Sequence, residues 1–374
     1  MRKTGNYQIL GNISYFIPDQ LPPENPPFEL TAEIMSLYGQ ASFALGQLNE
    51  MGRKLPDAKR FIKAYVIKEA LLSSSIEGIH TTLMEVFTHS LEEFSPSKDT
   101  QLVLNYTHAL DAALDLLQNQ NMPLVLRVIL KAHETLMSVG EGDKANPGVF
   151  RKQSVRVGKL VPPPALEVPN LMSDLETYIN EPSDQPPLIQ AGLAHVQFET
   201  IHPFLDGNGR IGRSLIVLML IDNDLLHSPM LYPSYYFKKH QLQYYQMLDR
   251  VRTHGDFEGW ISYYLKAITE SALDAYTRAQ EIEALELKLK QLIQTDPDFS
   301  KIKKTATHAL EFLFSQPITT IAQMSKKLGK AYNTTQNILK EFMKHGIVSE
   351  NIIHKRNKLY RFKPYLACLE KEYS

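Results

Sequence analysis

The segment 202–213, HPFLDGNGRIGR, constrains the fold more than any other part of the chain. It joins two apolar stretches, 187–201 and 211–225, that carry hydrophobic residues at helical spacing. Pro203 ends the first of these helices and biases His202 towards an extended conformation. The pattern therefore predicts a short, glycine-rich loop held between two buried helices.

The glycines of this loop suit it to bind an anion. Gly207 and Gly209 can adopt positive φ and let the backbone approach a ligand, and Asn208 tolerates the left-handed conformation. Free N–H groups at the start of the next helix, together with the helix dipole, favour negative charge there. Arg210 and Arg213 are three residues apart, so they can project from one helical face and bind neighbouring phosphate oxygens. A polyphosphate fits this set better than a single phosphate.

Two more side chains of the loop add chemistry. Asp206 offers hard oxygen ligands that can hold Mg²⁺ between phosphates. A neutral His202 can take a proton from an attacking hydroxyl. Phe204, between these polar groups, is expected to point into the core and anchor the loop. The alternative is a purely structural helix-capping loop, which is the weaker interpretation because so many role-matched residues share one short segment.

The segment fits the pattern H-x-F-x-(D/E)-G-N-G-R-x-x-R at every defined position, and on it the chain resembles Fic-domain proteins, in particular protein adenylyltransferases. The resemblance implies transfer of AMP from ATP to a hydroxyl side chain of a target protein, with release of pyrophosphate. It makes His202 the base, Asp206 the Mg²⁺ ligand and Gly207–Gly209 the anion hole. Arg210 and Arg213 would bind the β- and γ-phosphates. The nucleotide-binding residues expected are Gln197, His202, Pro203, Phe204, Leu205, Asp206, Gly207, Asn208, Gly209, Arg210, Arg213 and Lys239.

An inhibitory motif, (S/T)-x-x-x-E-(G/N), is a second point of resemblance. Ser73, Glu77 and Gly78 match it, and in such proteins the motif lies on a helix packed beside the site. If Glu77 reaches Arg213, its carboxylate occupies the guanidinium that would hold the γ-phosphate. The chain would then inhibit itself. The local sequence alone would suggest only an exposed helix residue next to a glycine C-cap.

The residues that precede the loop resemble the segment leading into the family's target-docking hairpin. Pro147–Arg151 and Val155–Gly158 carry this likeness, and strand and turn signals place the hairpin at about Ser154–Pro164. A target segment that adds there as a strand would be held through backbone hydrogen bonds. The alternative is an inert surface hairpin.

The aromatic-rich segment 232–249 is expected, by resemblance, to line the adenine pocket at its beginning. Lys239 is placed near the nucleotide, whereas Tyr236 and Tyr245 are expected in the core, because aromatic residues at helical spacing usually pack there. Gln197, on the helix that leads into the loop, is expected to face the site and bind the nucleotide or the flap. Further candidate neighbours of the nucleotide are Tyr235, His240 and Tyr244.

Composition excludes several classes of protein. A net charge of −1, from 40 basic and 41 acidic residues, gives no overall field that would attract nucleic acid or membranes. The single cysteine, Cys368, rules out an intrachain disulfide and a multi-cysteine zinc site. The N-terminus lacks an apolar signal region, and the apolar run 215–221 is too short to span a bilayer. We expect a cytoplasmic protein without a membrane partner, and a homodimer is an ordinary expectation for it.

Helical periodicity dominates the chain, so we predict a mostly α fold: a Fic-type helical core with a small β-hairpin flap, plus a C-terminal winged helix-turn-helix domain. The length of 374 residues favours more than one domain. The predicted parts are an N-terminal Fic-associated region at 1–110 with the inhibitory motif at 73–78, a catalytic core at 111–293, a linker at 294–304 and a winged-helix domain at 305–374. Helices are predicted at 31–52, 58–75, 100–119, 124–138, 168–181, 187–201, 211–225, 238–253 and 257–292.

The C-terminal part resembles a winged helix. Apolar spacing predicts helices at 309–314, 318–328 and 333–345, followed by two short strands around the basic turn 354–358. Winged helices bind DNA or dock proteins, so the fold alone does not decide between these functions. The basic residues of a candidate phosphate-contacting face are Lys326, Lys327, Lys330, Lys340, Lys344, Lys355, Arg356 and Lys358.

The sequence therefore favours an autoinhibited protein adenylyltransferase that uses ATP and Mg²⁺ and modifies a Ser, Thr or Tyr hydroxyl of a target protein or of itself. One alternative is a DNA-binding transcriptional regulator whose Fic core senses a nucleotide. Another is a Fic enzyme that uses a different nucleotide or removes AMP from its target. The motif names neither the target nor the base preference nor the signal that relieves inhibition.

Overall fold

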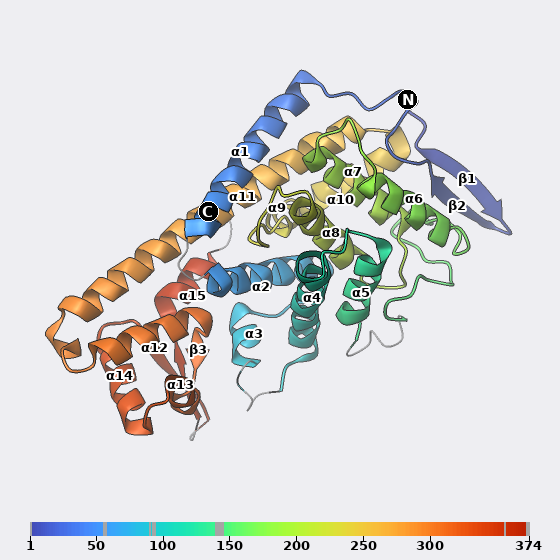
Figure 1. Cartoon of the computed structure of the whole chain (residues 1–374). Coiled ribbons are helices and arrows are strands. Elements are labelled where there is room, and N and C mark those ends of the chain that lie inside the picture. The colour runs from blue at the N-terminus through green and yellow to red at the C-terminus, as the bar shows by residue number, and fades with distance from the viewer. Residues whose placement is uncertain are drawn as a thin grey trace.

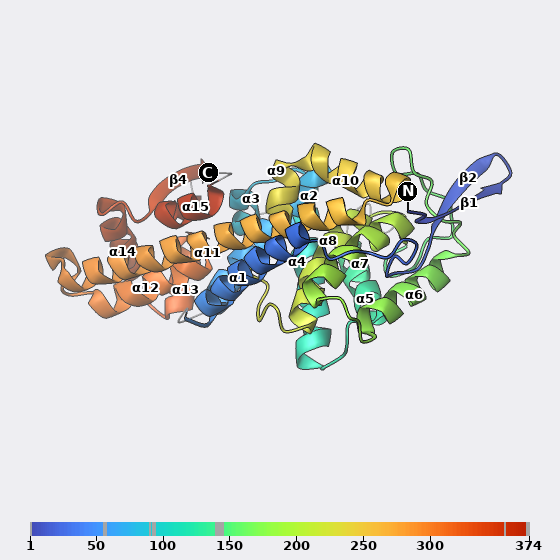
Figure 2. The ribbon, with the colours of Figure 1, turned by 90° about the horizontal axis from the view of Figure 1, so that it is seen from above.

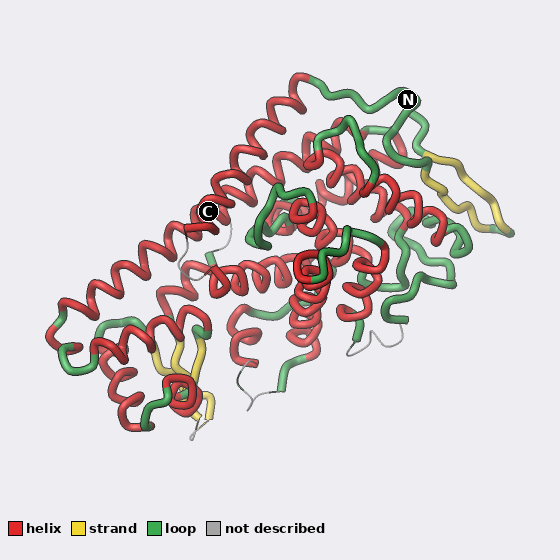
Figure 3. The backbone as a smooth tube through the Cα atoms, viewed as in Figure 1, coloured by secondary structure: helices red, strands yellow, loops and turns green. Residues whose placement is uncertain are grey.

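The protein, described here as a computed structural model, is mostly helical with two small sheets at opposite ends (Figures 1 and 3). One sheet is a two-stranded ribbon at the N-terminus, and the other has three strands and lies in the C-terminal part. In the described part of the chain, no helix is long and apolar enough to cross a membrane. The described residues are 2–54, 58–89, 91, 95–138, 146–354 and 357–371.

Helix α11 (Phe257–Thr295) is the longest element and runs along much of the molecule (Figure 2). Helix α1 (Ala32–Lys54) lies along it. The buried face of α11 carries a stripe of small and aliphatic residues. Near the start of α11, Trp260 donates a hydrogen bond from Nε1 to the carbonyl oxygen of Gly192 at 2.8 Å. This bond ties α11 to the helix that leads into the glycine-rich loop. The stripe consists of Ile268, Ala272, Ala275, Ala279 and Ile282.

Helices α7 (Pro187–Ile201) and α8 (Asn208–Asp222) form the centre of the core, and almost all of their side chains are buried. The two buried helices predicted on either side of the loop are confirmed. The second begins at Asn208 rather than at residue 211, because Gly207 caps it with φ 79°. The loop is therefore shorter than expected, and its glycine-rich end is already helical.

All nine predicted helical stretches are helical, with small shifts at their ends. Three short helices are not predicted, because one or two turns are too short to show a helical period: α3 (Leu83–His89), α9 (Ser234–Lys239) and α15 (Lys363–Glu370). The remaining helices before α11 are α2 (Ala58–Ile76), α3 (Leu83–His89), α4 (Lys98–Leu114) with a π-helical turn η1 (Asp115–Asn119), α5 (Leu126–Leu136), α6 (Val168–Asn180), α9 (Ser234–Lys239) and α10 (Gln241–His254).

The N-terminal ribbon pairs β1 (Gly5–Leu10) with β2 (Ile13–Pro18) in antiparallel register. Leu10 lies opposite Ile13, and the turn between them uses Gly11 at φ 62°. The ribbon projects from the end of the molecule near the N-terminus (Figure 1). It was not predicted.

The predicted flap, 154–164, is not a two-stranded hairpin. It holds a single isolated bridge between Val157 and Leu160, and the three prolines that follow Val161 have no N–H to extend a ladder. Instead, the N–H of Phe16 in β2 donates to the carbonyl oxygen of Val161 at 2.9 Å. The flap region is therefore closed on itself only at Val157 and Leu160, and beyond this turn it bonds to the N-terminal ribbon.

The C-terminal part contains the three predicted helices and the two predicted strands, and it packs on α11 through its first and last helices. The predicted helix start at Ile318 is wrong, because Ile318 and Thr319 pair with the last strand and Thr320 caps a helix that begins at Ile321. The sheet order is β3-β5-β4, all antiparallel. The elements are η3 (Pro297–Phe299), α12 (Lys303–Ser315), β3 (Ile318–Thr319), α13 (Ile321–Leu328), α14 (Tyr332–Lys344), β4 (Ser349–His354), β5 (Asn357–Arg361) and α15 (Lys363–Glu370).

Two of the basic residues proposed for a phosphate-contacting face already pair with carboxylates. Lys344 pairs with Asp298, and Lys358 pairs with Glu350 at 2.6 Å. The two residues at the tip of the predicted basic turn, 355 and 356, lie outside the described residues. The winged-helix and DNA-binding assignments stay predictions.

Candidate active site

Asn208 closes the loop. Its Nδ2 donates to the carbonyl oxygen of Phe204, and its Oδ1 accepts from the N–H of Phe204, both at 2.9 Å. Phe204 is fully buried, as predicted, and stacks face to face on His133 with ring centroids 3.7 Å apart. The Asn208 side chain is thus used to shape the loop, and its backbone is helical rather than left-handed.

His133, on α5, contacts the loop through Asp206 and Phe204. Its Nδ1 accepts from the N–H of Gly148 at 3.0 Å, so its Nε2 carries the proton and donates to the carbonyl oxygen of Asp206 at 3.1 Å. Burial lowers the pKa of His133 to about 4, which keeps the ring neutral. No local pattern in the sequence indicates this role.

The backbone of His202 is left-handed, with φ 51° and ψ 62°, so the predicted extended conformation is wrong. His202 caps α7, and the guanidinium of Arg151 gathers the carbonyl groups that turn inwards there. Arg151 donates from Nε to His202 O at 2.8 Å and from Nη2 to Ile201 O at 3.3 Å. Its other hydrogen bonds go to the carbonyl oxygens of Gln153 and Pro163. One buried arginine therefore fixes both the end of α7 and the flap region.

His202 is half-buried, and its Nδ1, which is buried, has no hydrogen-bond partner in the described structure. Burial lowers its pKa to about 4. A neutral imidazole beside an anion cradle can accept a proton.

Gly209 makes room for a carboxylate at the start of α8. A Cβ built on Gly209 would lie 2.2 Å from Oε1 of Glu77 and 2.9 Å from Nη1 of Arg213. Gly209 itself is helical, so it serves by its lack of a side chain and not by positive φ. The Glu77 carboxylate lies where an anion bound to the helix N-terminus would lie.

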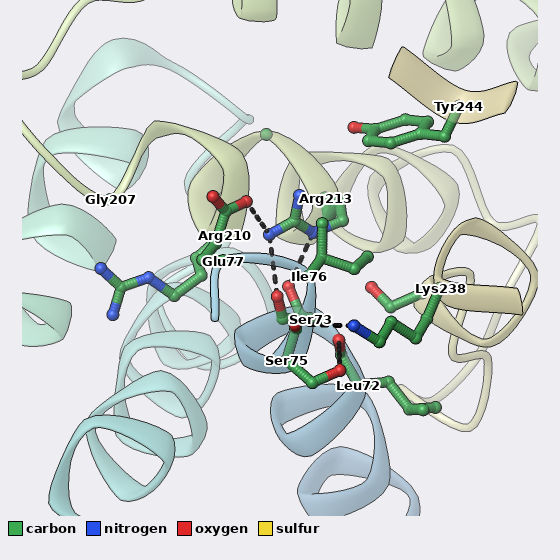
Figure 4. A network of polar contacts seen from close by, with 12 residues as sticks. Leu72, Ser73, Ser75, Ile76, Glu77, Gly207, Arg210, Arg213, Lys238 and Tyr244 are labelled. Carbon is green, nitrogen blue, oxygen red and sulfur yellow. Dashed lines mark hydrogen bonds and ion pairs between the residues drawn. The ribbon is translucent and has the colours of Figure 1, made fainter. Parts of the chain in front are cut away.

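Arg213 is fully engaged by the end of α2 (Figure 4). It donates from Nε to Ser73 Oγ at 2.8 Å, and from Nη2 to Ser73 O at 3.0 Å and to Glu77 Oε1 at 2.7 Å. Burial acts to lower the pKa of Arg213, but the charge of Glu77 and other nearby groups outweigh it and raise the pKa above its usual value. The predicted contact between the inhibitory motif and Arg213 is present, and Gly78 ends the motif at φ 79°.

Arg210, in contrast to Arg213, has few hydrogen-bond partners among the described residues. Its side chain is 3% exposed, yet Nε and Nη1 have no hydrogen-bond partner among the described residues. Only Nη2 has polar neighbours, at 3.5 Å from Oδ1 of Asp206 and 4.0 Å from the sulfur of Met137. Figure 4 shows it pointing away from Arg213, so the two guanidinium groups do not share one face as predicted. A buried cation with unused donors is suited to receive an anion.

Asp206 is accessible beside this cation. Its side chain is 66% exposed, and Oδ1 accepts from the N–H of Gly207 at 2.6 Å. An exposed carboxylate next to an anion cradle fits the oxygen ligands that Mg²⁺ prefers.

The other predicted site residues hold the surroundings of the loop. Gln197 is buried and donates to the carbonyl oxygen of Asp19 at 2.9 Å, so it binds the segment after the ribbon and not the flap. Pro203 is buried and accepts from the N–H of Arg151, and Leu205 is half-buried against the core.

The adenine-pocket candidates differ among themselves. Lys239 is exposed and pairs with Glu270 of α11 at 3.6 Å. Tyr236 is buried, as predicted, but Tyr245 is 44% exposed, so its assignment to the core is wrong. It lies on the outer side of α10 and reaches the end of α2 instead. The buried candidates are Tyr235 and Tyr244, the latter bonded to His195 at 2.9 Å, and His240 is half-buried beside Tyr236.

Three residues that the sequence did not assign to the site prove to shape it. Arg151 lies in the segment Pro147–Arg151, whose pattern indicates its position but not its role. His133 and Lys238 show no local pattern, because their partners are far away in the sequence.

Comparisons with known proteins agree with this geometry. Residues 35–115 match the family described as Fic/DOC family N-terminal, and residues 123–220 match the Fic/DOC family. Over these two segments the chain is similar to the Fic/DOC family.

Similar proteins cover different shares of the chain. "Protein adenylyltransferase Fic" of Drosophila mojavensis is 29% identical over 272 residues, 71% of this chain and 51% of that protein. The protein of the same name from Drosophila ananassae is 30% identical over 240 residues, 62% of this chain and 45% of that protein. The chain spans about half the length of these curated relatives.

Solved structures share the fold. A Fic family protein from Desulfovibrio desulfuricans G20 has a TM-score of 0.56 and 23% identity, covering 90% of this chain and 98% of that one. Fic-1 from C. elegans has a TM-score of 0.52 and 19% identity, covering 68% of this chain and 74% of that one.

Proposed function

We propose that this chain is an autoinhibited protein adenylyltransferase, which transfers AMP from ATP to a hydroxyl group of a target protein or of itself. The observation that carries the proposal is the buried Arg210 with unused donors, beside a glycine-lined helix N-terminus and a neutral histidine. The relatives named protein adenylyltransferase support the same reaction.

The reaction needs a base and a binding site for the leaving group. The hydroxyl oxygen of the target attacks the α-phosphorus of ATP, the bond from that phosphorus to the bridging oxygen breaks, and pyrophosphate leaves. The hydroxyl proton passes to the neutral imidazole of His202. Arg210 and the N–H groups at the start of α8 hold the β- and γ-phosphates. The products are an AMP ester of the hydroxyl and pyrophosphate.

Asp206 is the residue that would hold Mg²⁺. Bound there, the ion would offset negative charge on the phosphates. The rest of the cradle supplies only nitrogen donors, so the chain neutralises the leaving group mainly through Arg210 and the backbone of α8.

Glu77 explains inhibition in this proposal. Its carboxylate lies over Gly209 and holds Arg213, so it competes with a phosphate for the same position. ATP would then bind weakly or with its α-phosphorus misaligned for attack.

Incorporation of label from α-³²P-ATP into protein, with Mg²⁺ and a cell lysate, tests the proposal. Wild type should give little label, Glu77→Gly more, and Glu77→Gly/His202→Ala about 100-fold or more below Glu77→Gly, because general-base catalysis is worth about 10²–10⁴-fold. Label that persists without His202 would refute the catalytic assignment. Label from another nucleotide, or loss of AMP from a modified target, would move the assignment to a related Fic reaction.

A further inference from the structure

The end of the inhibitory helix α2 is held by side chains other than Arg213. Lys238 donates from Nζ to the carbonyl oxygen of Ser75 at 2.9 Å, and Gln241 donates from Nε2 to that of Ile76 at 2.9 Å. The hydroxyl of Tyr245 donates to the same Ile76 oxygen at 3.3 Å. We name Lys238, Gln241 and Tyr245 the latch.

The latch residues come from two helices, α9 and α10, and bind the end of α2 together. Lys238 is in the last turn of α9 and Gln241 is the first residue of α10, and Lys238 also donates to Gln241 Oε1 at 3.0 Å. Figure 4 shows the Lys238 ammonium pointing at the last turn of α2. The latch therefore binds backbone carbonyl groups at the end of α2 and not the Glu77 side chain.

The carbonyl groups in the last turn of a helix have no donor within the helix. A lysine there meets this need and also interacts favourably with the negative end of the helix dipole. In α2 these carbonyls belong to Ser75 and Ile76, which directly precede Glu77. The latch thus fixes the piece of backbone from which the inhibitory carboxylate extends.

The ion pair alone holds Glu77 weakly. Its side chain is 35% exposed, and ion pairs open to solvent contribute little. A shift of the helix end by about an ångström would lengthen the 2.7 Å contact with Arg213 beyond good hydrogen-bond distance. How often Glu77 reaches Arg213 therefore depends on how firmly the end of α2 is held.

We propose that the latch residues are positioning residues for autoinhibition: they keep the last turn of α2 in the place where Glu77 blocks the cradle. This inference rests on the proposed function. Disruption of the latch raises the fraction of molecules whose cradle is open, although Glu77 and Arg213 are both intact.

The body of α2 has separate anchors, so a latch variant keeps its fold. The buried carboxylate of Glu69 accepts from the N–H and the hydroxyl of Ser234, and α2 packs its apolar face into the core. Only the last turn is released. This makes Lys238→Met/Gln241→Leu a suitable test, with Tyr245→Phe as the mildest variant because it removes a single oxygen.

The experiment measures two quantities in the full chain. The first is amide hydrogen exchange over residues 72–80, and the second is AMP incorporation from labelled ATP. Gln243→Leu is the matched control, since Gln243 is exposed on α10 and forms no side-chain hydrogen bond among the described residues. Thermal unfolding checks that each variant is folded.

We expect Lys238→Met/Gln241→Leu to exchange about tenfold faster over 72–80, because two hydrogen bonds of ordinary strength are lost. AMP incorporation should rise by a similar factor with Glu77 present, and should not rise further when the same changes are made in Glu77→Gly. Tyr245→Phe should show a smaller effect of the same sign, and Gln243→Leu none.

Unchanged exchange in the folded double variant would overturn the latch. So would faster exchange without more label, if Glu77→Gly does raise the label, because α2 would then be loosened without relief of inhibition. No label even in Glu77→Gly would instead overturn the proposed function and with it the inhibitory role, while the exchange data would still report whether the latch holds α2.

Discussion

The two arginines at the start of α8 lie in contrasting surroundings. On the side that faces α2, Arg213 donates three hydrogen bonds to Ser73 and Glu77. On the side that faces α5, Arg210 is as deeply buried but leaves two nitrogen atoms unpaired among the described residues. One side of the cradle is satisfied by the chain itself, and the other is prepared for a ligand.

The contrast shows which of the two arginines destabilises the folded protein. A buried guanidinium without acceptors is unfavourable, and burial lowers the pKa of Arg210 accordingly. Arg213 escapes this cost because Glu77, at the end of α2, supplies a carboxylate. If Glu77 inhibits the protein as proposed, inhibition and stability are coupled on the α2 side and separate on the α5 side.

The largest expected effect is that of Arg213→Met on folding. It removes two charge-assisted hydrogen bonds to the buried Ser73 as well as the contact with Glu77, so the free energy of unfolding should fall by about 3 kcal/mol. Denaturant unfolding measures this. A loss below about 1 kcal/mol would mean that the α2 side is not held by Arg213.

Glu77→Gly should tighten the binding of ATP with Mg²⁺ by about 10–100-fold, the range expected when a charge-assisted hydrogen bond no longer competes with the ligand. Isothermal titration calorimetry measures the change. The gain should be lost when Arg210→Met is added, since the α5 side would then lack its cation. Equal affinity in wild type and Glu77→Gly would show that the carboxylate does not compete with the phosphates.

Arg210→Met is expected to change the free energy of unfolding by less than about 1 kcal/mol, because the charge it removes has few partners to lose. The same unfolding experiment that tests Arg213→Met provides the comparison. If both variants were equally destabilised, the contrast between the two sides would be wrong.

The smallest expected change is in the titration of His202, whose pKa burial lowers to about 4 from 6.5. Because the folded pKa is the lower one, the stability that neutral His202 contributes is present above pH 6.5 and is lost as the pH falls through about 4. The ring NMR signals, assigned with His202→Gln, should not move between pH 8 and pH 5. A midpoint near 6.5 would place His202 in solvent.

Local sequence was sufficient for the long helices and for the burial of Phe204. The contact of Glu77 with Arg213 followed from the resemblance to Fic proteins, because the local sequence alone suggests an exposed helix residue. The left-handed backbone of His202 was missed, since Pro203 disfavours only the right-handed helical region and the deciding partner, Arg151, is 51 residues away.

The ribbon and the flap show a different kind of failure. Gly11-Asn12 between two alternating runs is a hairpin signal that local sequence does contain. The flap was read as a hairpin of its own, but its prolines end the pairing, and Val161 bonds to Phe16 instead. Local sequence does not determine whether the extended segment around Val161 pairs within the flap or with the strand that contains Phe16.

Helix α11 makes the molecule mechanically stiff along one line. Its 39 residues rise by 1.5 Å each, so the rod is roughly 60 Å long, and a tilt of about 5° at one end displaces the other by about 5 Å. One end is bonded to α7 through Trp260, and the other carries the C-terminal helices. A partner that binds the C-terminal helices and tilts α11 would therefore also shift the end of α11 that contacts α7, the helix capped by His202.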